Sequence, residues 1–230
     1  MIGEIGFRIE QNIERASKEQ MEALKPFACA QLSDGLNKFY TMDSGIMQMF
    51  PADKFIGTAI TVKTRSADNL MLHKAISLIK PGDVLVIDTQ GCVNYSLMGE
   101  LMVSSMEKLG LVGIVADGCI RDIEDLEKIG LPVFARGTTP AVGDKDGPGE
   151  INVPICCGGV VVMPGDVIVA DSDGIVVIPK ADLDVVAKKA EKKAFYESKR
   201  REAIARGELI KADVDELLAK KGLIITEGEK

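Results

Sequence analysis

Aromatic residues and histidine are scarce in this sequence. Its 230 residues include no tryptophan, 4% aromatic residues and a single histidine, His73. With so few aromatics, the chain offers no stacking platform for nucleic-acid bases or sugars. A Ser–His–Asp or Cys–His triad would have to use His73, whose place in a predicted helix favours a structural role. We therefore do not expect a catalytic triad.

Motifs that bind phosphate or zinc are missing as well. The sequence has no GxSxG, GxxxxGK(S/T) or GxGxxG motif, which argues against a nucleophile elbow and a phosphate-binding loop. Its cysteines lack the spacing of a zinc site, and the adjacent pair makes a poor chelate and a strained disulfide. The five are Cys29, Cys92, Cys119, Cys156 and Cys157. We expect reduced, mostly buried thiols in a cytoplasmic protein.

Long apolar runs and excess positive charge are also lacking. No apolar stretch reaches about 18 residues, so we expect no membrane span. The N-terminus has no basic region followed by an apolar run, so we expect no signal peptide. The net charge of −7 repels phosphate backbones, and nucleic acid is therefore not an expected partner. The one basic run, Lys188–Arg201, alternates with glutamates and is typical of a solvated helix face.

The residues that are present indicate one α/β domain. Hydrophobic residues make up 46% of the chain and charged residues 27%, which is enough for one substantial core. Buried strands are predicted at 84–88, 111–117 and 131–136, with helices at 98–109 and 122–129 between them. This alternation indicates parallel strands joined by crossover helices.

The rest of the chain predicts a mixed sheet flanked by helices. A strand is predicted over 57–65, and short strands over 151–155, 159–163, 166–171 and 174–179. Helices are predicted over 9–25, 28–37, 69–79, 181–205 and 211–221. We therefore expect a single domain over 1–230, with its core at residues 28–180 and helical extensions at 1–27 and 181–230.

One short phrase is repeated. Pro-Gly-Asp-Val occurs at 81–84 and again at 164–167, each time before an apolar strand that ends in aspartate. The segments around the two copies do not otherwise match. We interpret the phrase as a repeated turn into a strand, not as a duplicated domain.

The segment Gly99–Asp125 concentrates the groups that could do chemistry. Residues 99–102 should lie at a helix N-terminus, where free N–H groups and the helix dipole favour a carboxylate. Asp117 is expected at the carboxyl end of a buried strand, the edge where α/β sheets bind ligands. Arg121 and Asp122 follow at the turn into the next helix. The residues alone leave a second interpretation open, in which Asp122 caps that helix and Arg121 makes a surface ion pair.

A pyruvate-like 2-oxo acid would suit the first interpretation. Its carboxylate needs N–H donors, its keto oxygen needs a Lewis acid, and its enolate needs fixed positive charge nearby. A helix N-terminus, a carboxylate that binds a hard metal and an arginine supply these three needs. A divalent-metal site for a 2-oxo acid is thus one of the two interpretations that the residues of this segment alone leave open.

Several phrases together resemble the RraA-like family. They are Gly99-Glu100-Leu101, Asp117-Gly118-x-x-Arg121-Asp122-x-x-Asp125 and Arg136-Gly137, supported by Asp68-Asn69-Leu70 and the two Pro-Gly-Asp phrases. The resemblance covers residues 28–205. The family contains the 4-hydroxy-4-methyl-2-oxoglutarate/4-carboxy-4-hydroxy-2-oxoadipate aldolases and the regulators of ribonuclease E activity. The combined phrases are specific, whereas no single one is.

The resemblance implies a fold, an assembly and an activity. The fold would be a compact β/β/α domain, assembled as a homotrimer or a dimer of trimers. The aldolases of the family are lyases that depend on a divalent metal, Mg²⁺ or Mn²⁺. They cleave 4-hydroxy-2-oxo diacids to pyruvate and a second oxo acid, and they commonly decarboxylate oxaloacetate.

The resemblance also assigns roles to residues of this chain. Asp122 would hold the metal, largely through water, and Asp125 would supply a further acidic position beside it. Arg121 would contact the pyruvate part and stabilise the enolate. The backbone amides from Gly99 through Glu100 and Leu101 to Met102 would bind the substrate carboxylate. Glu100 would orient a catalytic water, and Glu197 or Glu202 of the C-terminal helix would complete a neighbouring subunit's site.

Two alternatives remain. A regulator that binds a ribonuclease would keep the fold without the catalysis, although the acidic positions and the long C-terminal helix favour the aldolases. A lyase for a sugar-acid-derived 2-oxo acid would keep the site, with loops 38–55 and 138–150 setting the substrate. Those loops contain Tyr40, Asp43, Lys145 and Asp146. A Schiff-base mechanism is not favoured, because neither Lys74 nor Lys80 lies in a pattern that marks it.

Overall fold

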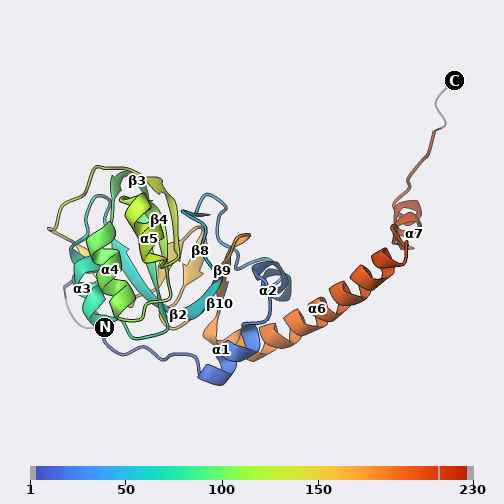
Figure 1. Ribbon diagram of the computed structural model, residues 1–230, viewed down its shortest axis with the longest axis horizontal. Coiled ribbons are helices and arrows are strands. Elements are labelled where there is room, and N and C mark those ends of the chain that lie inside the picture. Colours follow the sequence, from blue (N-terminus) through green and yellow to red (C-terminus); the bar gives the residue numbers. More distant parts are fainter. Residues whose placement is uncertain (1–3, 212, 227–230) are drawn as a thin grey trace. The chain divides into compact units, whose positions relative to one another are not determined.

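The computed structural model describes residues 4–211 and 213–226. By its internal contacts the chain divides into two compact units, Met1–Glu191 and Lys192–Lys230. The first unit contains a mixed eight-stranded sheet in which the main path of strands runs β1-β5-β4-β3-β2-β9-β10, with β6 beside β2 (Figure 1). The fold is therefore of the predicted α/β class.

Four neighbouring strands of this sheet are parallel. They are β2 (Phe55–Thr64), β3 (Asp83–Ser96), β4 (Gly113–Ile120) and β5 (Val133–Thr138). The helices α3 (Leu70–Ala75), α4 (Glu100–Lys108) and α5 (Ile123–Ile129) connect them in turn. The predicted alternation of strands and crossover helices between residues 84 and 136 is thus confirmed.

The remaining strands are short and antiparallel to their neighbours. In the main sheet they are β1 (Met47–Gln48), β6 (Gly149–Ile151), β9 (Val167–Asp171) and β10 (Gly174–Ile178). A separate hairpin consists of β7 (Ile155–Cys157) and β8 (Val160–Val162). The strand expected over 151–155 is wrong, because Asn152 adopts a left-handed conformation (φ 56°) that separates β6 from β7.

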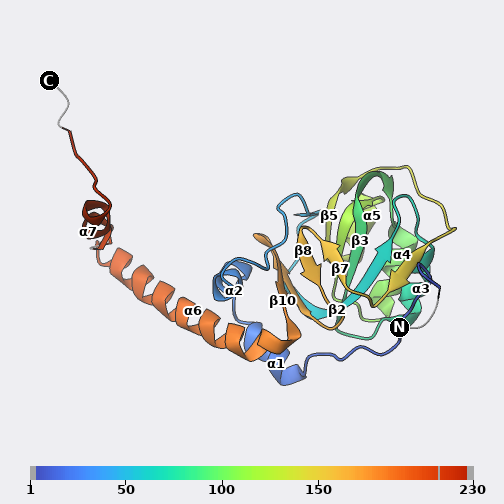
Figure 2. The same ribbon diagram turned by 180° about the vertical axis from the view of Figure 1, so that it is seen from behind.

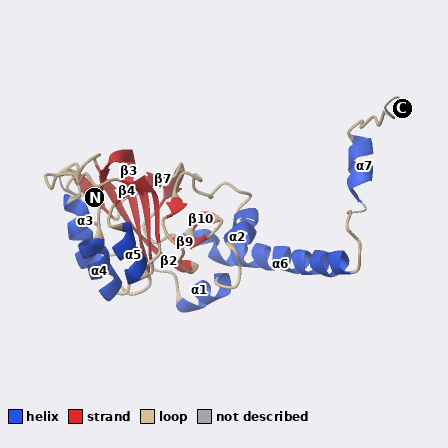
Figure 3. Cartoon of the chain, turned by 45° about the horizontal axis from the view of Figure 1, so that its top comes forward, coloured by secondary structure: helices blue, strands red, loops and turns tan. Residues whose placement is uncertain are grey.

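Alternating side chains of the parallel strands supply two cores, one on each face of the sheet. Leu85 and Ile87 pack toward α3, α4 and α5, which cover one face (Figure 3). Val84 and Val86 pack on the opposite face, in one core with residues of the β7–β8 hairpin (Figure 2). This sequence of hairpin, sheet and helices is the expected compact β/β/α arrangement.

The N-terminal helix is shorter than predicted. Residues 9–17 are not helical, and Ile9 forms a bridge with Ile151 of β6 while Glu10 N–H donates to the Ile151 carbonyl at 3.1 Å. The helix α1 (Lys18–Leu24) begins only after Ser17, whose capping box with Gln20 fixes its start. Apolar side chains at helical spacing therefore belong here to an extended segment that packs on the core.

The helices that precede and follow β2 in the chain, α2 (Cys29–Gly35) and α3, are also shorter than expected. Helix α2 ends before Asn37, which is left-handed. The helix predicted over 69–79 is α3 followed by a 3₁₀ turn, Ile76–Leu78. Together with α1 and the first turns of α6 (Leu183–Ala205), α2 packs on β9 and β10 in a third core.

Both copies of the repeated phrase form the predicted turn into a strand. The buried carboxylate of Asp83 accepts a hydrogen bond from Lys80 N–H at 2.7 Å, and that of Asp166 accepts one from Met163 N–H at 2.9 Å. Each aspartate thus closes its turn by binding the backbone N–H of the residue three positions earlier. Asp83 is additionally bound by Arg15 through two hydrogen bonds of 2.8 and 2.9 Å.

The second unit contains the end of α6 and the short helix α7 (Asp213–Lys220). Within it, the Arg200 guanidinium donates to the carbonyls of Glu208 and Leu209, at 2.7 Å each.

Among the described helices, none combines the length and apolarity needed to cross a membrane. All five cysteines are free, as predicted, and burial raises the pKa of the Cys29 and Cys157 thiols, which disfavours their thiolate forms.

Candidate functional site

A cavity of about 290 Å³ lies at the carboxyl edge of the four parallel strands. Each loop that follows one of these strands contributes to its wall. The lining residues are Asn69 and His73 after β2, Met98, Gly99, Leu101 and Met102 after β3, Arg121 and Asp122 after β4, and Val142, Gly143 and Lys145 after β5. The predicted site therefore lies at the edge where open α/β sheets bind ligands.

Asp122 reaches from the start of α5 to the N-terminus of α4. Its Oδ2 atom accepts a hydrogen bond from Glu100 N–H at 3.0 Å, and Arg121 Nε lies 3.6 Å from the same oxygen. The first intrahelical bond of α4 runs from Val103 N–H to the Gly99 carbonyl. The N–H groups of Leu101 and Met102 precede that bond and have no partner within the helix, so they can donate hydrogen bonds to an anion.

The geometry bears on the second interpretation of Asp122 and Arg121. Asp122 occupies the N-cap position of α5 but its side chain makes no capping hydrogen bond, whereas the expected ion pair of Arg121 is present, with Asp122 itself. The Asp122 backbone is left-handed (φ 63°), a conformation that costs a non-glycine residue about 1–3 kcal/mol. Asp122 is thus held in a strained conformation that turns its carboxylate away from its own helix and toward α4.

Gly99 makes room for this carboxylate. A Cβ atom at position 99 would overlap Asp122 Oδ2 and touch Arg121 Cγ at 3.0 Å. The Gly99 backbone is extended (φ −141°), which any residue can adopt. Glycine is therefore required at this position for space and not for conformation.

Two buried polar atoms in the cavity wall have no hydrogen-bond partner. Among the described residues, only three buried side-chain nitrogen or oxygen atoms lack a hydrogen bond: Asn69 Oδ1, Asn152 Oδ1 and Arg121 Nε, the last of which has only its 3.6 Å ion pair with Asp122. Asn69 and Arg121 line the cavity, whereas Asn152 does not. The Asn69 amide is oriented by its Nδ2 atom, which donates to the Leu97 carbonyl at 3.0 Å. An unsatisfied buried group costs about 1–3 kcal/mol, so both residues carry a local energetic cost.

Two further residues line the cavity: His73, for which a structural role is expected, and Lys145, which belongs to a loop expected to set the substrate. Desolvation lowers the pKa of the His73 imidazole, and the positive charge of Lys145 lowers it further. The imidazole is therefore neutral at neutral pH. One sequence signal was available for His73, because it lies four residues after Asn69 and therefore on the same side of a helix.

Glu100 and Asp125 are engaged with residues of their own helices. Glu100 Oε1 accepts a hydrogen bond from the Ser104 hydroxyl at 2.8 Å, and Asp125 Oδ1 accepts one from Lys128 Nζ at 2.8 Å. Asp125 also borders a second hollow of about 560 Å³, which Arg121 and Asp122 line as well. Arg121 and Asp122 therefore lie between the two hollows, and the roles of Glu100 and Asp125 stay predictions.

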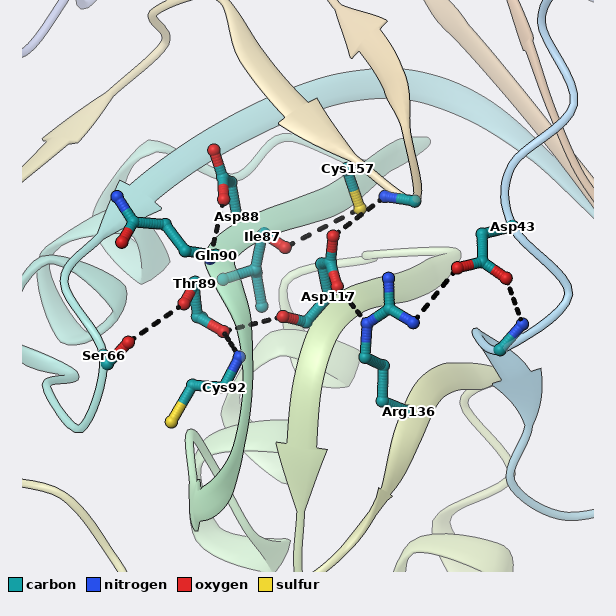
Figure 4. Close-up of polar contacts among 12 residues, drawn as sticks. Asp43, Ser66, Ile87, Asp88, Thr89, Gln90, Cys92, Asp117, Arg136 and Cys157 are labelled. Carbon is teal, nitrogen blue, oxygen red and sulfur yellow. Dashed lines mark hydrogen bonds and ion pairs between the residues drawn. The ribbon is translucent and has the colours of Figure 1, made fainter.

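Asp117 does not reach the cavity wall. It was expected at the carboxyl end of its strand, but β4 continues three residues further, to Ile120. Its carboxylate is bound by Arg136 and accepts a hydrogen bond from Gly158 N–H at 2.9 Å (Figure 4). Arg136 in turn pairs with Asp43 at 3.3 Å (Figure 4). Asp117 and Arg136 therefore join β4 and β5 to neighbouring loops, and Asp43 belongs to this network too.

The described lining of this cavity offers a divalent cation one carboxylate, that of Asp122. Within residues 4–211 and 213–226, no group of three His, Cys, Asp or Glu side chains could hold a metal. Mg²⁺ commonly binds through one or two carboxylates plus substrate oxygens and water. Asp122 fits this requirement, because its side chain is part-exposed at the cavity wall and only its Oδ2 atom is hydrogen-bonded within the described chain.

The two glutamates proposed from the C-terminal helix lie in the second unit. Glu197 forms ion pairs with Lys193 and Arg201, at 4.0 and 3.8 Å, and Glu202 pairs with Lys199 at 3.0 Å. All of these partners are on α6 itself. A role for either glutamate at a neighbouring site stays a prediction.

Comparison with known proteins bears on both fold and family. The RraA-like family model, described as Aldolase/RraA, matches residues 29–177. A protein of Halalkalibacterium halodurans named "Putative 4-hydroxy-4-methyl-2-oxoglutarate aldolase" is 42% identical over 78% of this chain and 85% of its own length. A protein of the same name from Ectopseudomonas mendocina is 38% identical over 56% of this chain and 79% of its own.

Solved structures show the same fold. Streptomyces coelicolor RraAS2, described as an unusual member of the RNase ES inhibitor RraA protein family, has a TM-score of 0.75 and 29% identity over 83% of this chain and 99% of its own. The RNA-processing inhibitor RraA from Thermus thermophilis has a TM-score of 0.62 and 28% identity over 66% and 92%. Because the family model spans more than half of the sequence, and the 42% identical relative more than two thirds, the chain belongs to the RraA-like family.

Proposed function

We propose that the protein is a divalent-metal-dependent lyase. It cleaves 4-hydroxy-2-oxo diacids of the 4-hydroxy-4-methyl-2-oxoglutarate type to pyruvate by a retro-aldol reaction, and it decarboxylates oxaloacetate as a side activity. The names of the relatives support an aldolase. The observation that carries the proposal is the cavity wall, which brings Arg121, Asp122 and Asn69 together at the N-terminus of α4.

Each polar group of such a substrate has a counterpart in the cavity. The C1 carboxylate would bind the amides of Leu101 and Met102, and the keto oxygen would face Arg121. The C4 hydroxyl would lie beside Asn69 and donate its one proton to a water. The distal carboxylate would face Lys145, the second cation of the cavity wall. Both ends of a dicarboxylic substrate would thus meet positive charge or N–H donors.

The chain's own groups would then direct the bond cleavage. Loss of the C4 hydroxyl proton to a water oriented by Glu100 allows the C3–C4 bond to break, and its electron pair moves into a pyruvate enolate. Arg121 stabilises the charge on the enolate oxygen, and proton return to C3 gives pyruvate. A divalent cation held by Asp122 would supply Lewis acidity at the keto oxygen. Glu100 can take this part only if its carboxylate leaves Ser104.

The first test is pyruvate release with and without metal. Purified protein should release pyruvate from oxaloacetate and from 4-hydroxy-4-methyl-2-oxoglutarate when Mg²⁺ or Mn²⁺ is present, followed by coupled oxidation of NADH with lactate dehydrogenase. Excess chelator should abolish the signal, and excess Mg²⁺ should restore it, because the proposed Lewis acid is a bound cation. The coupling enzyme alone, challenged with pyruvate and chelator, is the control.

The substrate range decides between the lyase hypotheses. A panel that includes sugar-acid-derived 2-oxo acids would identify the other kind of lyase by a higher kcat/KM. If no 2-oxo acid in the panel released pyruvate with either metal, the lyase proposal would be wrong.

Lys145 should govern affinity for the distal carboxylate. We expect Lys145→Gln to raise KM for 4-hydroxy-4-methyl-2-oxoglutarate roughly tenfold with little change in kcat, since one charge-assisted hydrogen bond is lost to a distal carboxylate that stays intact in the reaction. Steady-state kinetics would measure this. Lys108→Gln is the matched control, because Lys108 is an exposed α4 residue paired with Glu107 and does not line the cavity. Equal KM values for the two variants would contradict this role.

A ribonuclease regulator is the second candidate, favoured by the likeness to RraAS2, a member of the RNase ES inhibitor RraA family, and to the RNA-processing inhibitor RraA. An acidic protein of this kind could cover a basic RNA-binding surface. Titration of the chain into a ribonuclease E-type cleavage assay tests it. Inhibition without pyruvate release would replace the lyase proposal, and pyruvate release without inhibition would dismiss the regulator.

The proposal includes assembly as a homotrimer or a dimer of trimers. Light scattering should then give three or six times the 24.7 kDa of one chain. A monomeric mass would contradict it.

A further inference from the structure

Two loops of the cavity wall are joined to each other along their backbones. The segment before α3 and the loop after β5 exchange two hydrogen bonds, from Asp144 N–H to the Ala67 carbonyl at 2.7 Å and from Asn69 N–H to the Asp144 carbonyl at 3.0 Å. The first segment leads into Asn69 and His73, and the second carries Lys145. Their contact therefore sets the distance between two sides of the cavity.

Asp68 holds these loops together with its side chain. Its Oδ1 atom accepts a hydrogen bond from Leu70 N–H at 2.9 Å, at the start of α3. Its Oδ2 atom accepts hydrogen bonds from Asp146 N–H and Gly147 N–H, at 2.8 Å each. The carboxylate is buried, and Arg65 Nη2 lies 3.6 Å from Oδ2. One buried anion thus binds three amides from two segments that are far apart in sequence.

The packing of the backbone leaves little tolerance at this contact. A Cβ atom on Gly143 would overlap the carbonyl group of Ala67, so the two backbones touch directly. Ala67 itself is left-handed (φ 61°), a strained conformation for a residue with a side chain. The hydrogen bonds that backbone N–H groups donate to the Asp68 carboxylate offset the free-energy cost of this close approach.

We propose that Asp68 is a positioning residue that fixes Lys145 opposite Asn69 and His73, and so sets the length of substrate that the cavity accepts. The inference rests on the proposed function, since it concerns the same cavity. Asp68 lies outside the cavity lining and touches no reacting group. Its effect should therefore appear in substrate affinity, while bond cleavage near Arg121 and Asp122 depends on β4 and α4.

Asp68→Asn tests the proposal without changing the size of the side chain. One amide oxygen can still accept a hydrogen bond, but the new NH₂ group would face backbone donors, and the negative charge is lost. We expect faster hydrogen exchange at Asp146 and Gly147. KM for 4-hydroxy-4-methyl-2-oxoglutarate should rise roughly tenfold with kcat within about threefold of wild type, and the ratio of this KM to that for the shorter oxaloacetate should change.

Asp166→Asn is the matched control for the loss of a buried, amide-binding aspartate. Asp166 accepts hydrogen bonds from Met163 N–H at 2.9 Å and Lys180 N–H at 3.1 Å, and it does not line the cavity. It should lower the melting temperature without raising KM. If Asp68→Asn did not fold, Arg65→Gln, which removes only the exposed partner of Asp68, should shift the same exchange rates and KM in the same direction to a smaller degree.

Two results would overturn the proposal. One is unchanged exchange at Asp146 and Gly147 in Asp68→Asn, which would show that the carboxylate does not hold the loop. The other is faster exchange with an unaltered KM, which would show that the loop position does not control binding. Absence of turnover in the wild type would refute the lyase proposal instead, and the exchange measurement would still decide whether Asp68 anchors the loop.

Discussion

Replacing Asp122 with asparagine is expected to lower kcat for pyruvate release by about 10²–10³-fold, while the fold is kept. Asparagine tolerates the left-handed backbone that Asp122 adopts (φ 63°). Its side-chain oxygen can still accept the hydrogen bond from Glu100 N–H that Asp122 Oδ2 accepts at 3.0 Å. The variant therefore loses the negative charge and keeps the local geometry.

Metal affinity should fall together with turnover. In the proposed site Asp122 is the one carboxylate that lines the cavity of about 290 Å³, so its charge is the main attraction for a divalent cation there. Mn²⁺ binding, followed by electron paramagnetic resonance, should weaken in Asp122→Asn even where activity is too low to measure. Unchanged Mn²⁺ affinity with full activity would contradict the assignment of Asp122.

Asp125→Asn is the control for Asp122→Asn, because it removes a neighbouring carboxylate of the same helix. Asp125 lies one helical turn away, and its Oδ1 atom is bound by Lys128 Nζ at 2.8 Å on the exposed side of α5. The loss of such an exposed ion pair costs at most about 1 kcal/mol. We therefore expect near-normal turnover, and a loss as large as that of Asp122→Asn would place Asp125 beside the metal, as the family resemblance implies.

The central fold could be predicted because burial leaves a clear mark on a sequence. Strands such as 84–88 are buried on both faces and read as continuous apolar runs, which predicts a parallel strand and the edge at which ligands bind. The N-terminal segment has no such mark. Ile9 and Ile13 fit a helix by their spacing, yet they equally fit an extended segment that packs on the core, as the structure has it.

The site could be predicted only where it is contiguous in the sequence. Arg121 and Asp122 follow a strand directly, so the pattern that predicts the strand also predicts their place. Asn69 and Lys145 come from loops 76 residues apart, and only the hydrogen bonds between those loops bring them to one cavity. Asp117 shows that position near a strand end is not enough to predict a site residue. Its carboxylate forms an ion pair with Arg136 and does not line the cavity.

The second large effect is expected at Gly99, whose requirement for glycine could not be predicted from the sequence. Gly99→Ala adds one methyl group, which would overlap Asp122 Oδ2. The carboxylate must then leave the Glu100 amide, and with it the position from which it would hold the metal. A misplacement of about 1 Å in such a group can cost on the order of 10²-fold in rate. We expect a loss of this size in kcat/KM for oxaloacetate.

The stability of the Gly99→Ala variant separates this mechanism from simple misfolding. The Gly99 backbone is extended (φ −141°), so alanine fits its conformation, and the free energy of unfolding should fall by no more than about 1 kcal/mol. Gly35→Ala is the control, because its methyl group would meet its neighbours at 3.5 Å, an ordinary contact, at the end of α2. It should keep full activity, whereas full activity in Gly99→Ala would show that the contact between Asp122 and the α4 N-terminus is dispensable. Reduced activity in Gly99→Ala with an intact melting curve and weaker Mn²⁺ binding is the result that the geometry predicts.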